Sequence, residues 1–189
     1  MINQYDFTEL SLSGVFQITP FSSTDNRGML VKDYSQKLFK EKGIEFEPVE
    51  TLCIYSNCNV LRGLHFQRGK GQAKLLRCVS GLIWAVVVDL RSESSTCGKW
   101  IGEELTPEKE LFVPGGFALG TYALQDSILE CKCGEKFYAE YDDGIRWDDG
   151  DLNINWPIKI NFGELIISDR DKELPSFQHY IKTMILSNN

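Results

Sequence analysis

The feature that most constrains the fold is a close succession of short segments rich in β-branched and aromatic residues, separated by Gly, Pro, Asn or Asp. The segments are GVFQITPF (14–21), FEPVETLCIYS (46–56), KLLRCVSG (74–81), LIWAVVVDLR (82–91), KWIGEEL (99–105), ELFVPGGFALGTYAL (110–124) and SILECKC (127–133). Short strands with frequent turn signals are typical of a sandwich or barrel. We therefore expect an all-β fold, a mainly antiparallel jelly-roll barrel whose ligand cavity is lined by alternate residues of its strands.

Only two segments have a helical pattern. In YSQKLFKEKG (34–43), Tyr34, Leu38 and Phe39 share one face and Gly43 can end the helix. A second helix is expected around PSFQHYIKTMIL (175–186), and both would lie at the periphery. No repeat, linker or low-complexity tract interrupts the chain of 189 residues, so we expect a single domain over residues 1–189.

The charge balance restricts the class of partner. A formal net charge of −7 and a pI near 4.9 argue against a nucleic-acid-binding surface, which needs a basic face. A few Arg and Lys residues in a cleft could still hold a small anion. No run approaches the roughly 20 apolar residues of a membrane span, and no signal peptide is evident, so we expect a soluble, cytoplasmic protein. The six cysteines form no CxxC pair and are expected to be reduced and mostly structural.

One of only two histidines lies in the strand-like stretch LRGLHFQ (61–67). Strand alternation would place Arg62, Leu64 and Phe66 on one face and Gly63, His65 and Gln67 on the other. A core built on His65 and Gln67 would be poor, which favours a cavity-lining histidine, although a packed core histidine stays nearly as plausible on spacing alone.

A metal site at His65 is not expected. Jelly rolls that hold a transition metal commonly use an HxH pair, but Gln67 occupies the second position and only His179 is left to contribute. General base catalysis suits a histidine, whose ordinary pKa of about 6.5 lies near neutral pH. Such a base needs a carboxylate to fix its tautomer, and residue patterns alone do not identify that carboxylate.

Seven motifs together resemble one enzyme family. They are DNRGML (25–30), VLRGLHFQ (60–67), QAKLLRCVSGLIWAVVVDLR (72–91), LFVPGGFALG (111–120), GIRWDD (144–149), NINWP (153–157) and ISDRD (167–171). In this order they resemble the nucleotide-sugar epimerases of the dTDP-4-dehydrorhamnose 3,5-epimerase type, from about Gly14 to Asp171. The resemblance implies a cupin-like jelly roll, usually a homodimer. It also implies an isomerase that acts on an NDP-4-keto-6-deoxy sugar without metal or redox cofactor, in deoxysugar biosynthesis for surface polysaccharide.

The resemblance also implies catalytic roles. His65 would take a proton from a sugar carbon, and Asp171 would orient the imidazole. Removal of a proton next to the C4 ketone gives an enolate, whose oxyanion needs a preorganised positive donor. Lys74 matches the family position for that donor, with Arg62 nearby on the barrel wall.

Substrate-binding roles follow from the same resemblance. Arg27 matches an arginine that contacts the nucleotide end, often across the dimer interface, and Arg62 and Gln67 are expected near the sugar and the phosphates. Tyr138 is placed like the aromatic residue that stacks on the nucleobase. From sequence alone, Tyr138 could equally pack on Trp147.

Two positions depart from the family pattern. The usual FAHG is FALG here, which places Leu119 at a histidine position, and Cys131 stands where the family has the tyrosine that returns a proton opposite the histidine. A cysteine, with an ordinary pKa near 8.5, could donate this proton; a bound water or Tyr122 are the alternatives. Because the family tyrosine is tied to C5, we expect inversion of one carbon, C3 rather than C5. The altered pocket could also accept a heptose, or a GDP or CDP sugar.

Three other functions stay open. The chain could be a C3/C5 double epimerase, a non-catalytic sugar-nucleotide-binding cupin, or a ketoisomerase that moves the carbonyl through the same enolate. Retention of His65, Asp171, Lys74, Arg62 and Arg27 favours an epimerase over a binding module. Ketoisomerases of related fold typically have two active-site histidines close together, which this sequence does not offer.

Overall fold

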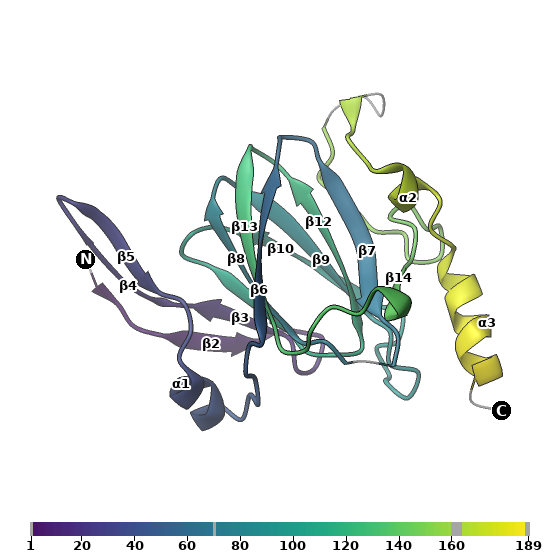
Figure 1. Cartoon of the computed structure of the whole chain (residues 1–189), viewed down its shortest axis with the longest axis horizontal. Helices are drawn as coiled ribbons and strands as arrows, with labels where there is room; N and C mark the ends of the chain where they lie inside the picture. Colours follow the sequence, from purple (N-terminus) through teal and green to yellow (C-terminus); the bar gives the residue numbers. More distant parts are fainter. Residues whose placement is uncertain (1, 70, 160–163, 188–189) are drawn as a thin grey trace.

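The structure is a computed structural model that describes residues 2–69, 71–159 and 164–187. Two large antiparallel sheets face each other, and a small sheet projects from one side (Figure 1). The six-stranded sheet has the order β2 (Asp6–Glu9), β3 (Phe16–Thr19), β11 (Glu110–Val113), β8 (Lys74–Ser80), β13 (Ser127–Cys133), β6 (Glu50–Ser56). The five-stranded sheet has the order β10 (Trp100–Leu105), β9 (Ile83–Asp89), β12 (Phe117–Ala123), β7 (Leu61–Gln67), β14 (Asp142–Gly144).

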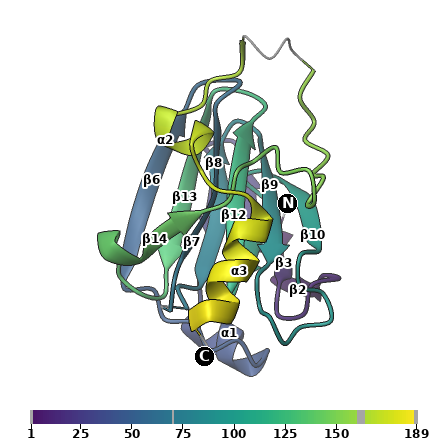
Figure 2. The same ribbon diagram turned by 90° about the vertical axis from the view of Figure 1, so that its right-hand side faces the viewer.

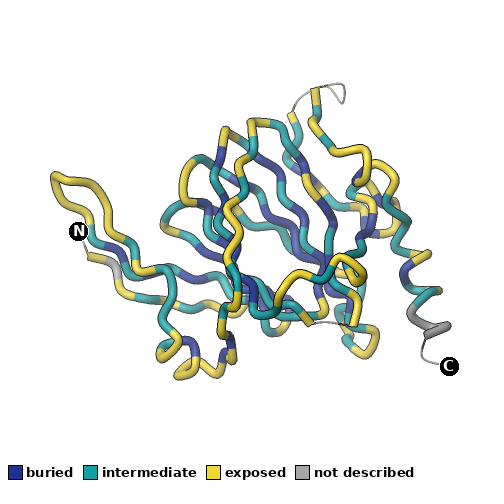
Figure 3. Tube along the Cα trace, in the orientation of Figure 1, coloured by how far each residue is buried: buried dark blue, intermediate teal, exposed yellow. Residues whose placement is uncertain are grey.

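The small sheet is an arm formed by β1 (Ile2–Asn3), β4 (Phe21–Asp25) and β5 (Gly28–Lys32). Much of it is exposed, including the hairpin tip between β4 and β5 (Figure 3). The described residues also form four short helical elements: α1 (Gln36–Glu41), the 3-10 helix η1 (Ala139–Tyr141), α2 (Asp169–Lys172) and α3 (Phe177–Ser187). No helix in the described ranges is long and apolar enough to cross a membrane.

The expected all-β, jelly-roll fold is confirmed. Each of the seven predicted segments contains a strand, and the segment at 110–124 is split into β11 and β12 by a turn at Pro114–Gly116. Both predicted helices are present as α1 and α3. The patterns did not predict α2, β14 or the arm, because two to five residues carry too little periodicity to be distinguished from loops.

Strand β9 is apolar from Ile83 to Val88 because both of its faces are covered. Ala85 and Val87 pack between the two large sheets, whereas Val86 and Val88 pack on the opposite face of the five-stranded sheet. Figure 2 shows α3 lying over that opposite face, where Tyr180 contacts Phe66 with a ring-centroid distance of 5.2 Å. A sheet covered on both faces needs hydrophobic residues at successive positions rather than an alternating pattern.

A third apolar cluster covers the outer face of the six-stranded sheet next to α1. Phe39 of α1 packs here against Phe46 and Phe112, with edge-on ring contacts between Phe39 and Phe112 and between Phe46 and Phe112. The two large sheets are therefore supported from outside by helices near both ends of the chain. The space between the sheets is filled by inward-facing residues of β8, β9, β10, β11, β12 and β13.

Candidate active site

His65 and Asp171 form the centre of the candidate site. The Nε2 atom of His65 lies 3.2 Å from Oδ1 of Asp171, with 27% of the histidine side chain and 6% of the aspartate side chain exposed. The backbone N–H of Gly63 donates to the second carboxylate oxygen, Oδ2, at 3.0 Å. Both oxygens of Asp171 are therefore engaged by β7, so the carboxylate and the imidazole are held in one relative orientation.

Helix α2 positions this carboxylate. Ser168 is the N-cap of α2, and its Oγ accepts a hydrogen bond from the backbone N–H of Asp171 at 3.1 Å. Burial alone would raise the pKa of Asp171, but the hydrogen bonds from His65 and from the Gly63 N–H outweigh it and hold the pKa of that carboxyl below its ordinary value. Asp171 is therefore an ionised acceptor at neutral pH.

The hydrogen bond to Asp171 determines which ring nitrogen of His65 can act as a base. When Nε2 carries the proton that is donated to the carboxylate, Nδ1 of the neutral ring keeps a free lone pair. This Nδ1 is buried and has no hydrogen-bond partner in the described part of the chain. A buried polar atom without a partner is uncommon in a folded protein and fits a group reserved for a ligand.

Gln67, two residues further along β7, has a similar arrangement. Its Oε1 accepts a hydrogen bond from the backbone N–H of Tyr138 at 3.0 Å. Its Nε2 is buried and lacks a partner among the described residues. Gln67 and His65 thus each present one unpaired polar nitrogen from alternate positions of the same strand.

The simple alternation expected for β7 breaks at Gly63. In the pairing of β7 with β12, His65 lies opposite Leu119 but Arg62 lies opposite Thr121, so the register shifts between them. Gly63 has a φ of +113°, and a Cβ there would lie 2.7 Å from the Cα of Gly120. Glycine is therefore required at this position by both backbone conformation and space.

The shift corrects our expectation for Arg62. The predicted alternation placed Arg62 on the face of Leu64 and Phe66, which pack on the α3 side of the sheet. Instead, the guanidinium of Arg62 donates to Ser56 Oγ and to the backbone oxygen of Tyr55, both at 3.2 Å. These acceptors belong to β6 of the six-stranded sheet, so Arg62 bridges the two sheets on the side of His65.

Lys74 and Cys131 come from the facing sheet. Lys74 begins β8 and lies beside Cys133 of β13 in the register of that pair. None of the described acidic residues forms an ion pair with Lys74. Cys131 and Cys133 are both buried between the sheets, and their sulfur atoms are 3.7 Å apart.

Leu119 connects the two walls of the site. It is the cross-strand neighbour of His65, and it packs against the cluster that contains Cys131 and Cys133. Both positions that depart from the family pattern therefore belong to the layer between the two sheets. Tyr122 does not, because it packs on the opposite face of the sheet, where its hydroxyl donates to Asn59 Oδ1 at 2.9 Å. This placement rules out Tyr122 as the replacement acid.

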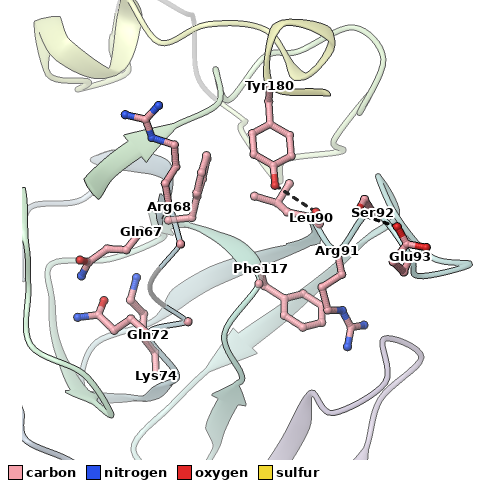
Figure 4. A pocket seen from close by; sticks show the side chains of 14 residues that line it. Gln67, Arg68, Gln72, Lys74, Leu90, Arg91, Ser92, Glu93, Phe117 and Tyr180 are labelled. Atoms are coloured by element: carbon pink, nitrogen blue, oxygen red, sulfur yellow. Dashed lines mark hydrogen bonds between the residues drawn. The ribbon is translucent and has the colours of Figure 1, made fainter. Parts of the chain in front are cut away.

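A cavity of about 330 Å³ opens beside Lys74 and Gln67 at one end of the barrel. Figure 4 shows Gln67, Gln72 and Lys74 along one side, with Phe117 and Arg91 further across the opening. His65 is not one of the lining residues, so the cavity does not contain the His65–Asp171 pair and is connected to it along β7 through Gln67.

Two predicted binding residues, Tyr138 and Arg27, are not among the residues that line this cavity. Tyr138 precedes η1, and its ring contacts that of Tyr141 at 5.9 Å and the Nζ of Lys136 at 5.0 Å. Arg27 lies at the tip of the arm hairpin, far from β7 in Figure 1, where it pairs with Asp25 at 2.6 Å. With 85% of its side chain exposed, Arg27 does not reach His65 within one chain.

Three contributors to the site were not predicted as such. The Gly63 N–H and the thiol of Cys133 gave no distinct sequence signal. Ser168 precedes Asp171 by three residues, the spacing of an N-cap that accepts from the N3 backbone N–H. That spacing could have indicated a helix start at Ser168 before the structure was known.

Comparison with known proteins identifies the family. The family profile described as dTDP-4-dehydrorhamnose 3,5-epimerase matches residues 9–179. The chain belongs to this family. It is 44% identical over 172 residues to the dTDP-4-dehydrorhamnose 3,5-epimerase of Methanothermobacter thermautotrophicus. The aligned region covers 89% of this chain and 92% of that protein. The resemblance predicted from the seven motifs is thus confirmed.

Solved structures of family members agree with the fold. The epimerase of Legionella pneumophila, in complex with dTDP-4-keto-L-rhamnose, matches with a TM-score of 0.88 and 28% identity over 93% of this chain and 94% of that chain. The 3'-monoepimerase ChmJ of Streptomyces bikiniensis, in complex with dTDP-quinovose, matches with a TM-score of 0.86 and 26% identity. The match covers 94% of this chain and 90% of that chain. Both double and single epimerases therefore share this architecture.

Proposed function

We propose that this epimerase inverts one carbon, C3, of an NDP-4-keto-6-deoxy sugar through an enolate. The observation that carries the proposal is the buried Asp171 carboxylate held against His65, which leaves Nδ1 of the imidazole unpaired. A neutral imidazole with one nitrogen fixed by a carboxylate is suited to take a proton from carbon at neutral pH. His65 would be the base and Asp171 its orienting partner.

In the first step, Nδ1 of His65 takes the C3 proton and the electron pair of the C–H bond forms the enolate. Negative charge then develops on the C4 oxygen, while the imidazolium is balanced by ionised Asp171. The ammonium of Lys74, which forms no ion pair with a described acidic residue, is the donor we assign to that oxygen. Preorganised donors of this kind typically contribute about 10²- to 10³-fold in rate.

Inversion requires that the proton return from the face opposite His65. The family tyrosine at this position is replaced by Cys131, on the facing sheet. Because the family tyrosine is tied to C5, we propose that its loss leaves C5 without an acid, that the shorter Cys131 serves C3 alone, and that this chain inverts only C3. Proton NMR of the product formed in D2O tests this assignment. Deuterium and inversion at C3 alone are expected, whereas double inversion at C3 and C5 would contradict it.

We assign binding of the diphosphate to Arg62, Gln67 and the Arg27 of a second copy of the chain. Arg27 is exposed on an arm that also exposes Ile2 and Leu30, at 65% and 61%. A two-fold homodimer in which each arm covers its neighbour would bury these apolar side chains and bring Arg27 to the other subunit's site. Tyr138, on the segment that hydrogen-bonds Gln67, is the residue we assign to stacking on the nucleobase.

The dTDP-linked 4-keto-6-deoxyglucose is the substrate to test first. The Legionella and Streptomyces relatives were each solved with a dTDP sugar. A GDP or CDP sugar, or a heptose, would be the next group to test because Leu119 and Cys131 alter the pocket. We further propose that the reaction belongs to deoxysugar biosynthesis for surface polysaccharide in the cytoplasm.

The placement of His179 argues against a ketoisomerase. That reaction would call for a second histidine beside His65, but His179 lies exposed on α3, outside the barrel. A non-catalytic binding module would not need an ionised carboxylate behind a base. Detection of a 3-keto product would favour the ketoisomerase. Absence of any solvent exchange would favour the non-catalytic binding module.

A further inference from the structure

Two thiols lie side by side on the inner wall of the barrel. Cys131 and Cys133 occupy alternate positions of β13, so both side chains point between the sheets, and only 4% and 1% of these residues are exposed. Their sulfur atoms are 3.7 Å apart, within reach of an S–H···S hydrogen bond. The tyrosine position of the family is thus occupied by one member of a thiol pair rather than by a lone cysteine.

Lys74 gives this pair an electrostatic partner. It is the register neighbour of Cys133, and its positive charge favours the thiolate form of either sulfur. The hydrogen bond between the sulfurs raises the pKa of Cys131, which also rises through burial, and lowers the pKa of Cys133. The pair is therefore arranged to lose one proton with the charge on Cys133, and to keep the other proton on Cys131.

The pair lies on the sheet opposite the one that carries the base. His65 lies on β7 of the five-stranded sheet, and its cross-strand neighbour Leu119 packs against the cluster that holds both thiols. A sugar ring between the sheets would present one face to His65 and the other to β13. The alternative donor Tyr122 is directed to the far side of its sheet.

We propose that Cys131 and Cys133 act as a two-thiol acid, in which Cys131 is the catalytic donor and Cys133 is a positioning residue that renews its proton. This inference rests on the proposed function. The S–H bond of Cys131 breaks as the enolate electron pair forms the new C–H bond. The Cys133 proton then passes to Cys131, which leaves a Cys133 thiolate beside the Lys74 ammonium.

Charge balance is simple in this scheme. The negative charge that leaves the C4 oxygen reappears on Cys133, still next to the same ammonium group of Lys74. His65 releases the proton it took to water, and water returns a proton to Cys133 before the next turnover. No oxidant, metal or further co-reactant is required.

The test measures two rates in D2O on the same sample. Deuterium wash-in at C3 reports proton removal by His65, and formation of the inverted product reports proton return from β13. For Cys131→Ala, and for the isosteric Cys131→Ser, we expect inversion to fall by about 100-fold or more, the usual contribution of a general acid. Wash-in with retention should stay within about threefold of wild type, because His65 can return deuterium to its own face.

Cys133→Ser tests the positioning role. Its inversion rate should fall by about tenfold, less than on removal of the acid itself, and the alkaline limb of its pH profile should move to lower pH because Cys131 loses the hydrogen bond that raises its pKa. A residue that only fills space would lower the rate equally at all pH values. The matched control is Cys78→Ser, a buried thiol of the same cluster whose Sγ bonds Ser80 O at 3.1 Å; its ratio of inversion to wash-in should be unchanged.

The outcomes are distinct. Folded Cys131 variants that keep the wild-type ratio of inversion to wash-in would overturn the two-thiol acid while leaving the proposed epimerase intact. Wild-type protein without any wash-in would remove the proposed function and this inference together. If Cys131→Ala fails to fold by circular dichroism, Cys131→Ser and Cys133→Ser decide the question.

Discussion

The Nε2 atom of His65 lies 3.2 Å from Oδ1 of Asp171, a carboxylate supplied by a four-residue helix near the far end of the chain. The same carboxylate accepts the N–H of Gly63, so one acidic side chain fixes both the imidazole and the backbone that precedes it. The dyad is thus a tertiary feature: it exists only when α2 docks on β7. Its integrity links the fold of the C-terminal segment to the proposed chemistry.

Asp171→Asn should reduce deuterium wash-in at C3 by about 100-fold or more, because the amide no longer favours the tautomer with a free Nδ1 or balances the imidazolium. The measurement is wash-in by proton NMR, under saturating substrate. Asp169→Asn is the matched control, since this carboxylate lies on the same helix with 95% of its side chain exposed. Equal rates for the two variants would contradict the role assigned to Asp171.

Gly63→Ala should impair both stability and activity. The added Cβ would lie 2.7 Å from Gly120 Cα and from the Leu119 backbone oxygen, at a φ of +113°. We expect the free energy of unfolding in urea to fall by about 1–3 kcal/mol, with loss of wash-in as the N–H moves away from Asp171. Gly43→Ala controls for conformation alone, since Gly43 has a φ of +76° but open space around it. A similar effect at both positions would argue against the close approach at Gly63.

Glu110 should make the protein less stable as pH rises. Burial, followed by the nearby charge of Asp33, raises the pKa of this fully buried carboxyl to about 9. Between its ordinary value of 4.5 and about 9, the folded state holds a proton that the unfolded state has lost. The free energy of unfolding therefore falls with pH over this window, by up to about 1.4 kcal/mol per pH unit.

Glu110→Gln should remove this slope. The variant should be more stable than wild type at pH 8 and indistinguishable from it near pH 4, in urea unfolding followed by fluorescence. Glu104→Gln, on the exposed surface of β10, is the control and should leave the pH dependence as in wild type. A Glu110→Gln variant that is destabilised at pH 8 would mean that Glu110 is ionised and paired, for example with Arg77 at 3.9 Å.

Arg27→Ala tests whether the active site is shared between two copies. Assayed alone, Arg27→Ala should bind substrate weakly and His65→Asn should react slowly. Mixed after subunit exchange in equal amounts, they should regain about one quarter of wild-type activity, because half of the dimers are mixed and each has one intact site. Failure to complement, with mixed dimers demonstrated by native mass spectrometry, would place Arg27 outside the partner's site.

Much of the fold was predictable because the strands of a jelly roll leave a strong local pattern. Every predicted strand segment contains a strand, since β-branched runs and turn residues act over a few neighbouring positions. The arm and β14 were missed for the opposite reason. Their strands are short, and those of the arm are largely exposed, so pairing partners rather than their own composition determine their conformation.

The site was predictable only in part. His65 and Asp171 could be paired through family resemblance, whereas the residue pattern alone gave no reason to bring them together. The face of Arg62 was predicted wrongly because a register shift at Gly63 depends on the contact with Gly120 of β12. The side taken by Tyr122 and the contact of Cys133 with Cys131 likewise arise from packing between elements, which no local pattern records.

The most direct test of the account is solvent exchange at C3 of dTDP-4-keto-6-deoxyglucose, measured by proton NMR in D2O for wild type and His65→Asn. Wild-type protein should wash deuterium into C3, and the variant should be slower by about 100-fold or more because asparagine cannot accept the proton. Wash-in by folded His65→Asn at the wild-type rate would contradict the central claim that His65 is the base.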